Sequence, residues 1–266
     1  MNNKWLIEMS QKPILSTLRL SLSMLWSNKL IFILVTVIYI LLTSMSFLIP
    51  FTVRGVSGDI SITLMIIVSV IISLFSQLFT ISNYLYIDRL VLDSDNKEAC
   101  IAKMATTKTL PLFFDFFKHA IASSLAIAVI VLPLIFVREG LNAGKLWDIF
   151  LIVLLVLALY VYPIVMYKIT LSHSFKEAFK ATFSIFSPSV WRQSLHIQYA
   201  KFVISLMLIL IGIYSLLVFI IETISDIGND VLGIPFLLLM MIFSIFFTLY
   251  VLPVSMMIAQ SIKTDD

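Results

Sequence analysis

The hydrophobic residues of this chain lie in six long runs that contain no Asp, Glu, Lys or Arg. Each run reaches the roughly 17–25 residues that a helix needs to cross a bilayer core about 30 Å thick. None shows the alternation of polar and apolar positions that is typical of outer-membrane barrel strands. The pattern therefore predicts an all-α, polytopic membrane protein. The runs cover residues 30–53, 60–87, 120–137, 149–167, 202–221 and 231–262.

With their polar ends included, the runs predict six transmembrane helices within one membrane domain that covers residues 1–266. The third helix is expected to begin near Phe117. Asp115, Lys118 and His119 stand at the entrance of its run, and a charge is tolerated there only because it lies near a helix end. The predicted helices cover residues 30–51, 61–86, 117–137, 147–167, 200–222 and 234–260.

Three prolines inside the runs are Pro133, Pro163 and Pro253. A backbone that crosses lipid must satisfy its own hydrogen bonds, so a proline there is expected to mark a kink or a packed site. The prolines therefore do not lower the number of predicted helices.

Residues 1–29 form a polar and amphipathic segment before the first run. Its polar positions recur at steps of three or four residues and are Lys12, Ser16, Arg19, Ser23 and Ser27. The apolar positions face the other way and are Ile14, Leu15, Leu18, Leu22, Leu25 and Trp26. This pattern predicts a helix on the inner surface of the membrane. The first run is too long for the apolar region of a cleavable signal peptide, so it should remain as an anchor.

The segment between the fourth and fifth runs has the same character. Phe175, Phe179, Phe183 and Phe186 form one stripe, and Lys176, Lys180, Ser184 and Ser187 form another. Each Lys near an anionic lipid surface contributes about 1 kcal/mol of binding. The favoured interpretation is that the segment seats a helix in the membrane interface. The alternative is a coupling helix for a partner protein, with Phe175, Phe179, Lys180, Phe183 and Phe186 as its contact residues.

Amphipathic inner segments before the first, third and fifth helices divide the chain into three units. The stretch from Leu159 to Met166 in helix four matches the stretch from Leu249 to Met256 in helix six. Units that run in the same direction predict a threefold parallel repeat of helix pairs about an axis along the membrane normal. Chance similarity between apolar helices is the competing explanation.

Charge sets the expected orientation. Of the eighteen Lys and Arg residues, fifteen fall on one side of the predicted helices, and only Arg54, Arg138 and Lys145 fall on the other. The positive-inside rule therefore places both termini in the cytoplasm. The composition, with 61% hydrophobic and 12% charged residues, also favours a membrane location. The net charge of +3 follows the same rule, so it does not indicate a nucleic-acid partner.

Two groups of ionisable residues lie close to the predicted membrane surface. Asp88 and Arg89 end the second helix, while Asp115, Lys118 and His119 begin the third. They form a candidate polar cluster at the inner face, where they would pair across the inner loop and stabilise the helix ends. A site for a lipid phosphate or a substrate headgroup is the alternative.

The sequence contains no recognisable set of catalytic residues. The three histidines, His119, His173 and His196, lack the spacing of a metal site, and Cys100 has no second cysteine to pair with. Nucleophile elbows, phosphate-binding loops and dinucleotide-binding glycine motifs are missing from the chain. We therefore expect no enzyme activity, cofactor or metal.

Several features together resemble a group of uncharacterised bacterial inner-membrane proteins with six helices. The residues that carry the resemblance are Pro163, Met166, Lys168, the stretch Glu177-Ala178-Phe179-Lys180 and Trp191. The group comprises the YciC-like proteins and the membrane domain fused to some glycerophosphodiester phosphodiesterases. The chain departs from it in its few glycines, seven in all. The resemblance implies a bacterial inner-membrane protein of unassigned activity and identifies no functional residue.

Three functional interpretations remain. The first is a transport-associated or lipid-associated membrane component. The second is the permease subunit of an ATP-binding cassette transporter with a separate ATPase, suggested by Glu177-Ala178 before a hydrophobic stretch, although the expected glycine is missing. The third is a non-catalytic envelope scaffold. Hydroxyl side chains concentrate in the first three helices, as a transport pathway or ordinary helix packing would require, at Thr36, Thr43, Ser44, Ser46, Ser69, Ser73, Ser76, Thr80, Ser82, Ser123 and Ser124.

Overall fold

The computed structural model describes residues 4–52, 58–140, 145–226 and 230–261. These residues form helices and short connections without a strand, which confirms the all-α prediction. The helices are α1 Lys4–Ser10, α2 Pro13–Ser27, α3 Lys29–Thr52, α4 Gly58–Leu92, α5 Lys97–Thr106, α6 Thr109–Phe114, α7 Phe117–Gly140, α8 Lys145–Thr170, α9 Phe175–Thr182, the 3₁₀ turn η1 Phe183–Phe186, α10 Pro188–Ser194, α11 Ile197–Asp226, α12 Asp230–Phe246, the π-helical segment η2 Phe247–Val251 and α13 Leu252–Ser261.

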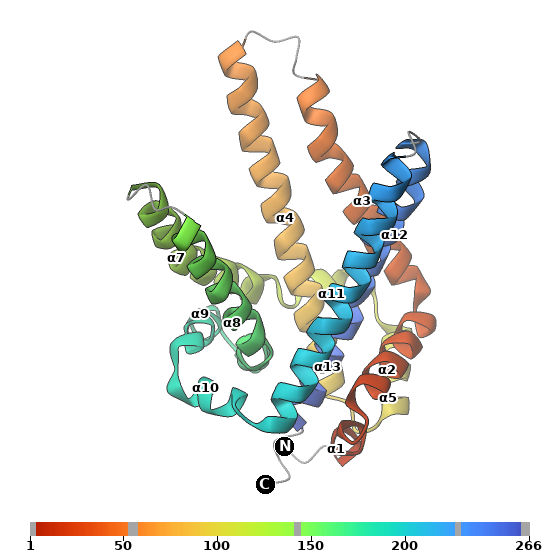
Figure 1. Cartoon of the computed structure of the whole chain (residues 1–266). Coiled ribbons are helices and arrows are strands. Elements are labelled where there is room, and N and C mark those ends of the chain that lie inside the picture. The colour runs from red at the N-terminus through yellow and green to blue at the C-terminus, as the bar shows by residue number, and fades with distance from the viewer. Residues whose placement is uncertain (1–3, 53–57, 141–144, 227–229, 262–266) are drawn as a thin grey trace.

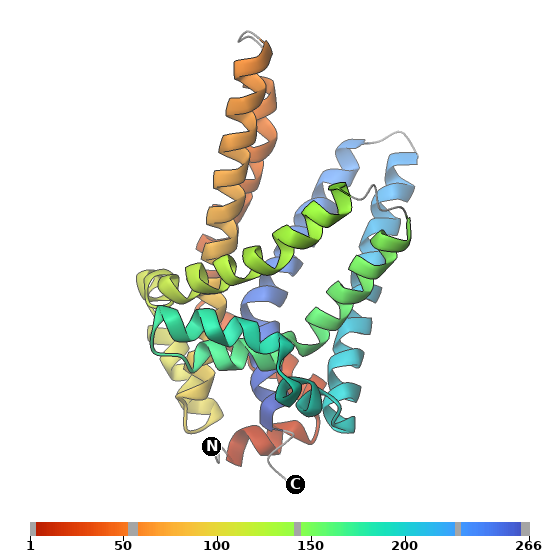
Figure 2. The ribbon, with the colours of Figure 1, turned by 90° about the vertical axis from the view of Figure 1, so that its left-hand side faces the viewer.

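The long helices form three hairpins, α3–α4, α7–α8 and α11–α12 (Figure 1). The short helices α1, α2, α5, α9 and α10 lie at one end of the molecule, and both ends of the chain lie there too (Figures 1 and 2). Helix α12 continues through η2 and α13 toward this end, where Ser261 Oγ donates to the carbonyl of Leu6 at 3.1 Å. We call it the terminal end.

Several helices are long and apolar enough to cross a membrane. Among the described residues these are Phe117–Leu134, Trp147–Thr170, Ile197–Ile220 and Leu238–Ser261. A fifth candidate joins Pro13–Ser27 to Lys29–Leu41, but the two parts meet at 90°. The chain therefore has the helices of a membrane protein, four or five by this measure. The side chains of residues 42–70, 72 and 73, and with them Thr43, Ser44, Ser46, Ser69 and Ser73, lie outside the described part.

The 90° bend separates the short helix α2 from the long helix α3. The face of α2 that packs on the protein consists of Thr17, Leu20, Ser21 and Met24. Of the predicted apolar stripe, Leu15, Leu18, Leu22 and Trp26 are exposed, whereas Ile14 and Leu25 pack against the core. An exposed apolar stripe of this kind is typical of a helix that lies in the membrane interface.

The packed core lies at the terminal end. Helix α13 contacts α1, α2, α4 and α8, and its residues Val254 to Ala259 are all buried. The outer parts of the hairpins pack less closely, and α8 exposes Leu155, Val156 and Leu157 on different faces. The hairpins thus meet at the terminal end and spread apart beyond it, as Figure 1 shows.

Helices α7 and α8 continue through Pro133 and Pro163. At Pro253 the chain responds differently, because the five residues before Leu252 are π-helical. Proline has no backbone N–H and its ring crowds the preceding turn, and a wider π turn is one way to relieve this. The wide turn lies where α12–α13 passes α4, since η2 contacts α4 and α2.

Leu20 provides a test of whether α2 belongs to the packed core. Its side chain is fully buried, so Leu20→Ala should lower the free energy of unfolding by about 2–5 kcal/mol. Leu22 is exposed on the same helix, and Leu22→Ala should have little effect. Thermal unfolding of the purified variants in detergent, followed by tryptophan fluorescence, measures both. Equal losses in Tm would show that α2 rests on the lipid surface rather than on the protein.

Candidate functional site

Two cavities lie between the long helices, one on each side of η2. The first is an apolar cavity of about 400 Å³ between α8, α11 and the η2–α13 segment. Its walls are mainly aliphatic and aromatic, with Val156 and Leu159 from α8, Leu206 and Ile211 from α11, and Met256 from α13. The volume falls within the roughly 300–1,000 Å³ of small-molecule pockets. The cavity opens between hairpins that expose apolar side chains, so an apolar ligand would fit it better than a polar one.

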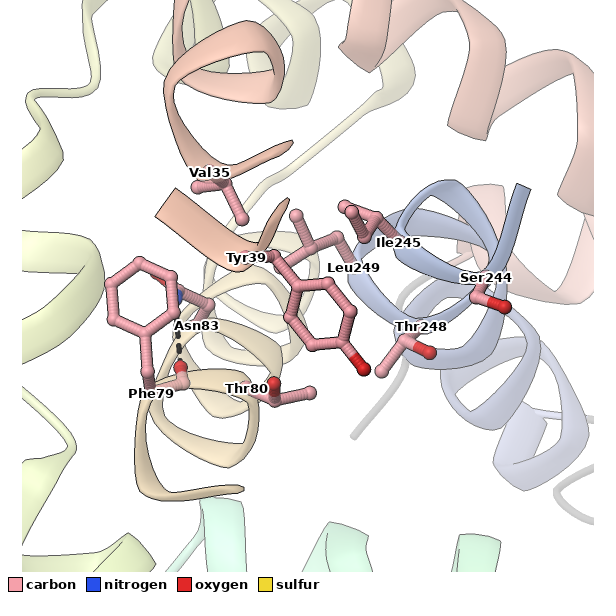
Figure 3. A pocket seen from close by; sticks show the side chains of 9 residues that line it. All are labelled: Val35, Tyr39, Phe79, Thr80, Asn83, Ser244, Ile245, Thr248 and Leu249. Carbon is pink, nitrogen blue, oxygen red and sulfur yellow. Dashed lines mark hydrogen bonds between the residues drawn. The ribbon is translucent and has the colours of Figure 1, made fainter. Parts of the chain in front are cut away.

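The second cavity is small and polar (Figure 3). It measures about 70 Å³ and lies between α3, α4 and the α12–η2 segment. Five of its lining residues carry polar side chains, namely Tyr39, Thr80, Asn83, Ser244 and Thr248, and the others are Val35, Phe79, Ile245 and Leu249. All nine lining residues are uncharged.

Asn83 is the most constrained of the polar residues in this cavity. Its side chain is 1% exposed, and its Nδ2 donates to the carbonyl of Phe79 at 2.7 Å, one turn earlier in α4. The Oδ1 atom has no hydrogen-bond partner among the described residues. A buried amide oxygen without a partner costs about 1–3 kcal/mol, so a water or another ligand in the cavity would stabilise it.

Thr80 presents oxygen in the same way. Its hydroxyl donates to the carbonyl of Ser76 at 2.8 Å, so only lone pairs remain for the cavity. Pro253 adds a backbone group, since it cannot donate to the carbonyl of Leu249 in an α-helical turn or of Thr248 in a π turn. Both of those residues line the cavity. Asn83 Oδ1 and the Thr80 oxygen therefore offer hydrogen-bond acceptors on the α4 side of the cavity.

Asp88 lies beyond the predicted span 61–86, at the terminal end of α4. It is fully buried, and the hydroxyl of Thr170 in α8 donates to its Oδ2. Its Oδ1 has no hydrogen-bond partner within the described part of the chain. Burial raises the pKa of Asp88 to about 7, and the Thr170 hydrogen bond opposes this rise. The neutral, protonated form of Asp88 is therefore favoured more strongly at this buried position than in water.

The other members of the predicted inner-face cluster have different neighbours. Arg89 forms an ion pair with Asp93 at 2.9 Å, one turn later in α4. His119 is buried, and its Nε2 lies 3.0 Å from the carbonyl oxygen of Ser172. Asp115 and Lys118 are exposed. The structure thus brings Asp88 and His119 to the end of α8, at Thr170 and Ser172.

Arg89 and Asp115 instead line one open polar groove of about 530 Å³. Asp93, Lys103 and Lys108 line it as well. Its charged groups largely balance one another, and Lys103 Nζ also contacts the carbonyl oxygen of Asp93. Cys100 lies near this groove in α5 as a buried free thiol, and burial raises its pKa to about 11. Such a thiol is unreactive at neutral pH.

The predicted coupling segment forms α9 and η1. Ser174 caps α9 by accepting from the backbone N–H of Glu177 at 3.3 Å, and Glu177 accepts from the backbone N–H of His173 at 2.8 Å. This capping box fixes where the helix begins. The same His173 hydrogen bond is the main reason that the pKa of Glu177 lies below its usual value.

Helix α9 packs on α7 and α8 through its other face, where Ala178 and Thr182 are buried. The aromatic stripe is only partly exposed. Phe179 packs against the core, and its ring lies 5.2 Å from that of the half-buried Phe183. Phe175, Lys180 and Phe186 are exposed, so these ends of the stripe are available to a lipid interface or to a partner.

Among the polar residues of the small cavity, Thr80 alone belongs to the hydroxyl residues that the sequence pattern singles out. The local signal for the others is spacing, because Thr80 and Asn83 are three residues apart and Ser244 and Thr248 are four apart. Such pairs share one face of a helix. The meeting of these faces with Tyr39 depends on helix packing, which the sequence does not reveal.

No family model, curated protein or solved structure matches this chain. The resemblance to the YciC-like group therefore stays a prediction.

Asp88→Asn tests the protonation of the buried carboxyl. The folded-state pKa of about 7 is above the unfolded value near 3.8, so the folded state holds the proton more tightly. The wild-type protein should therefore lose stability as pH rises from about 4 to 7, whereas the neutral amide should not. The stability of the variant relative to wild type should increase by about 1–3 kcal/mol between pH 5 and pH 8. Unfolding curves at both pH values measure this, and a constant difference would contradict it.

Proposed function

We propose that this protein is an integral membrane protein of the bacterial inner membrane that spans the bilayer six times and binds membrane lipid between its hairpins. In this proposal the three hairpins each cross the membrane twice, and the terminal end lies in the cytoplasm. The protein is a lipid-associated component without enzyme activity.

The arrangement of the chain ends supports the proposed topology. Both ends lie at the same end of the molecule, as an even number of crossings requires (Figure 2). The short helices there carry many of the basic residues, among them Arg19, Lys97, Lys103, Lys176 and Arg192. The positive-inside rule places such a layer in the cytoplasm, where anionic lipid attracts it.

The order of elements supports a threefold repeat. Short helices precede each hairpin, with α2 before α3–α4, α5 and α6 before α7–α8, and α9 and α10 before α11–α12. The matching stretches of the fourth and sixth predicted helices lie at Pro163 in α8 and Pro253 in α13. In this proposal the short helices of each unit lie in the membrane interface, and the hairpin of each unit crosses the membrane.

The observation that carries lipid binding is the apolar cavity of about 400 Å³. A void of this size between membrane helices leaves its walls without contacts on one side, and an acyl chain would restore them. Lipid tails are as apolar as leucine, so this gain comes from shape and packing rather than from exclusion of water. The cavity is therefore suited to a lipid that stays bound when the surrounding bilayer is removed.

Two pairs of substitutions test this proposal. Val156→Trp with Ile211→Trp places two large side chains at the cavity wall, and both positions are exposed, so the fold should tolerate them. The matched control is Val153→Trp with Leu208→Trp on the same two helices but outside the cavity. The exposed fractions are 53% and 59% for the first pair and 49% and 63% for the control.

Native mass spectrometry of the proteins purified in mild detergent measures the fraction that retains a phospholipid. We expect the cavity pair to reduce this fraction at least threefold relative to wild type, while the control pair leaves it unchanged. Equal retention in both pairs would contradict a lipid site in this cavity.

The exposed ends of the aromatic stripe favour a second candidate, the permease subunit of an ATP-binding cassette transporter. Phe175 and Phe186 are exposed beside Lys180, on a short helix that packs against two long ones. Force on such a helix would reach the hairpin α7–α8. A nucleotide-binding ATPase that co-purifies with the protein in equal amounts would favour this candidate. The Phe186→Glu variant should lose the ATPase, whereas the Leu195→Glu variant should keep it. Leu195 is a suitable control because it is exposed nearby in the chain.

A further inference from the structure

We propose that the small polar cavity between α3, α4 and α12–η2 binds a sodium ion. This inference rests on a different cavity from lipid binding and does not depend on it. The cavity is lined by Asn83, whose Oδ1 is buried without a partner in the described structure, and by the hydroxyl-bearing residues Tyr39, Thr80 and Thr248 (Figure 3). The hydroxyl of Ser244 points away from them and bonds the hydroxyl of Tyr214.

The direction of the existing hydrogen bonds selects a cation. Asn83 uses its amide N–H and Thr80 uses its hydroxyl proton to bond the carbonyls of Phe79 and Ser76. The Oδ1 of Asn83 and the hydroxyl oxygen of Thr80 therefore remain as acceptors, while one N–H of the Asn83 amide remains as a donor. An anion would meet the two acceptors unfavourably, whereas a cation or the hydrogen atoms of water would be stabilised.

Backbone oxygen adds to the site. Pro253 leaves the carbonyl of Leu249 or Thr248 without its usual donor, and the π-helical segment lies at this point. Interrupted helices supply such carbonyls to sodium and proton sites at membrane depth in transporters. Here the helix stays continuous but is widened by a π-helical turn, and that turn lies beside neutral side chains.

Charge selects a monovalent ion. Calcium and magnesium sites use carboxylates, and none lines this cavity. The volume of about 70 Å³ is more than one water molecule needs, so the cavity has room for a small cation together with water.

The test is the thermal stability of the purified full chain in detergent at constant ionic strength. Sodium chloride is compared with choline chloride, and the sodium concentration is varied. A ligand that binds only the folded state raises Tm with a saturable concentration dependence. At ten times the dissociation constant we expect a rise of about 3–5 °C.

Thr80→Val with Thr248→Val is the matched variant, because valine keeps the shape of threonine and removes its oxygen. We expect this variant to fold and to lose the sodium-dependent rise in Tm. Thr223→Val is the control, since Thr223 is an exposed threonine on α11 outside the cavity, and it should keep the rise. Binding of radioactive sodium to wild type and variant gives a second measurement that does not depend on stability.

Three results would overturn the proposal. The first is an equal Tm in sodium and choline chloride, which would leave water as the occupant. The second is a rise that persists in the double variant. The third is an equal rise with potassium chloride, which would indicate an unselective salt effect.

Discussion

The packing of α13 at the terminal end is the interaction on which the rest of the structure depends. This helix contacts α1, α2 and α4 from the first third of the chain and α8 from the middle of the chain. It therefore joins the C-terminal part of the chain to both. Tyr84 of α4 donates its hydroxyl to the sulfur of Met256, and Ser261 reaches the carbonyl of Leu6. Helix α4 adds direct contacts with α7 and α8, so the hairpins meet at this end and spread apart farther from it.

Both cavities follow from that arrangement. Helix α13 packs against α4, and α12 packs against α11. The π-helical segment η2 connects α12 to α13. The wide turn at Pro253 separates an apolar space toward α8 and α11 from a polar space toward α3 and α4. One local feature of the backbone thus borders two sites of opposite chemistry, and Thr248 lines both.

Much of the fold could be predicted because the bilayer imposes simple rules on sequence. Each of the six apolar runs lies mainly within the long helices, and α7 begins at Phe117 as expected. The amphipathic pattern before α3 identified the short helix that meets it at 90°. Helix number and direction depend on local composition, which a single sequence contains. The count of six crossings and the threefold repeat remain proposals, because four or five helices meet the criteria of length and apolarity.

The sites were harder to predict, since they depend on which helix faces meet. Asp88 was expected to pair across the inner loop, yet its partner is Thr170, eighty-two residues away in α8. Tyr39 and Asn83 carry no distinguishing local pattern, and only packing brings them to one cavity. The exposed face of α9 was predictable from its stripe of phenylalanines, but what covers that face depends on a partner outside the chain.

The central claim is that three hairpins cross the membrane from one cytoplasmic layer of short helices. Single cysteines at Glu222, Lys145 and Lys176, on a Cys100→Ser background, test it most directly in intact cells with a maleimide that does not cross membranes. The account predicts that Glu222→Cys and Lys145→Cys react from outside, whereas Lys176→Cys reacts only after the inner membrane is permeabilised. Labelling of all three positions from the same side would contradict it.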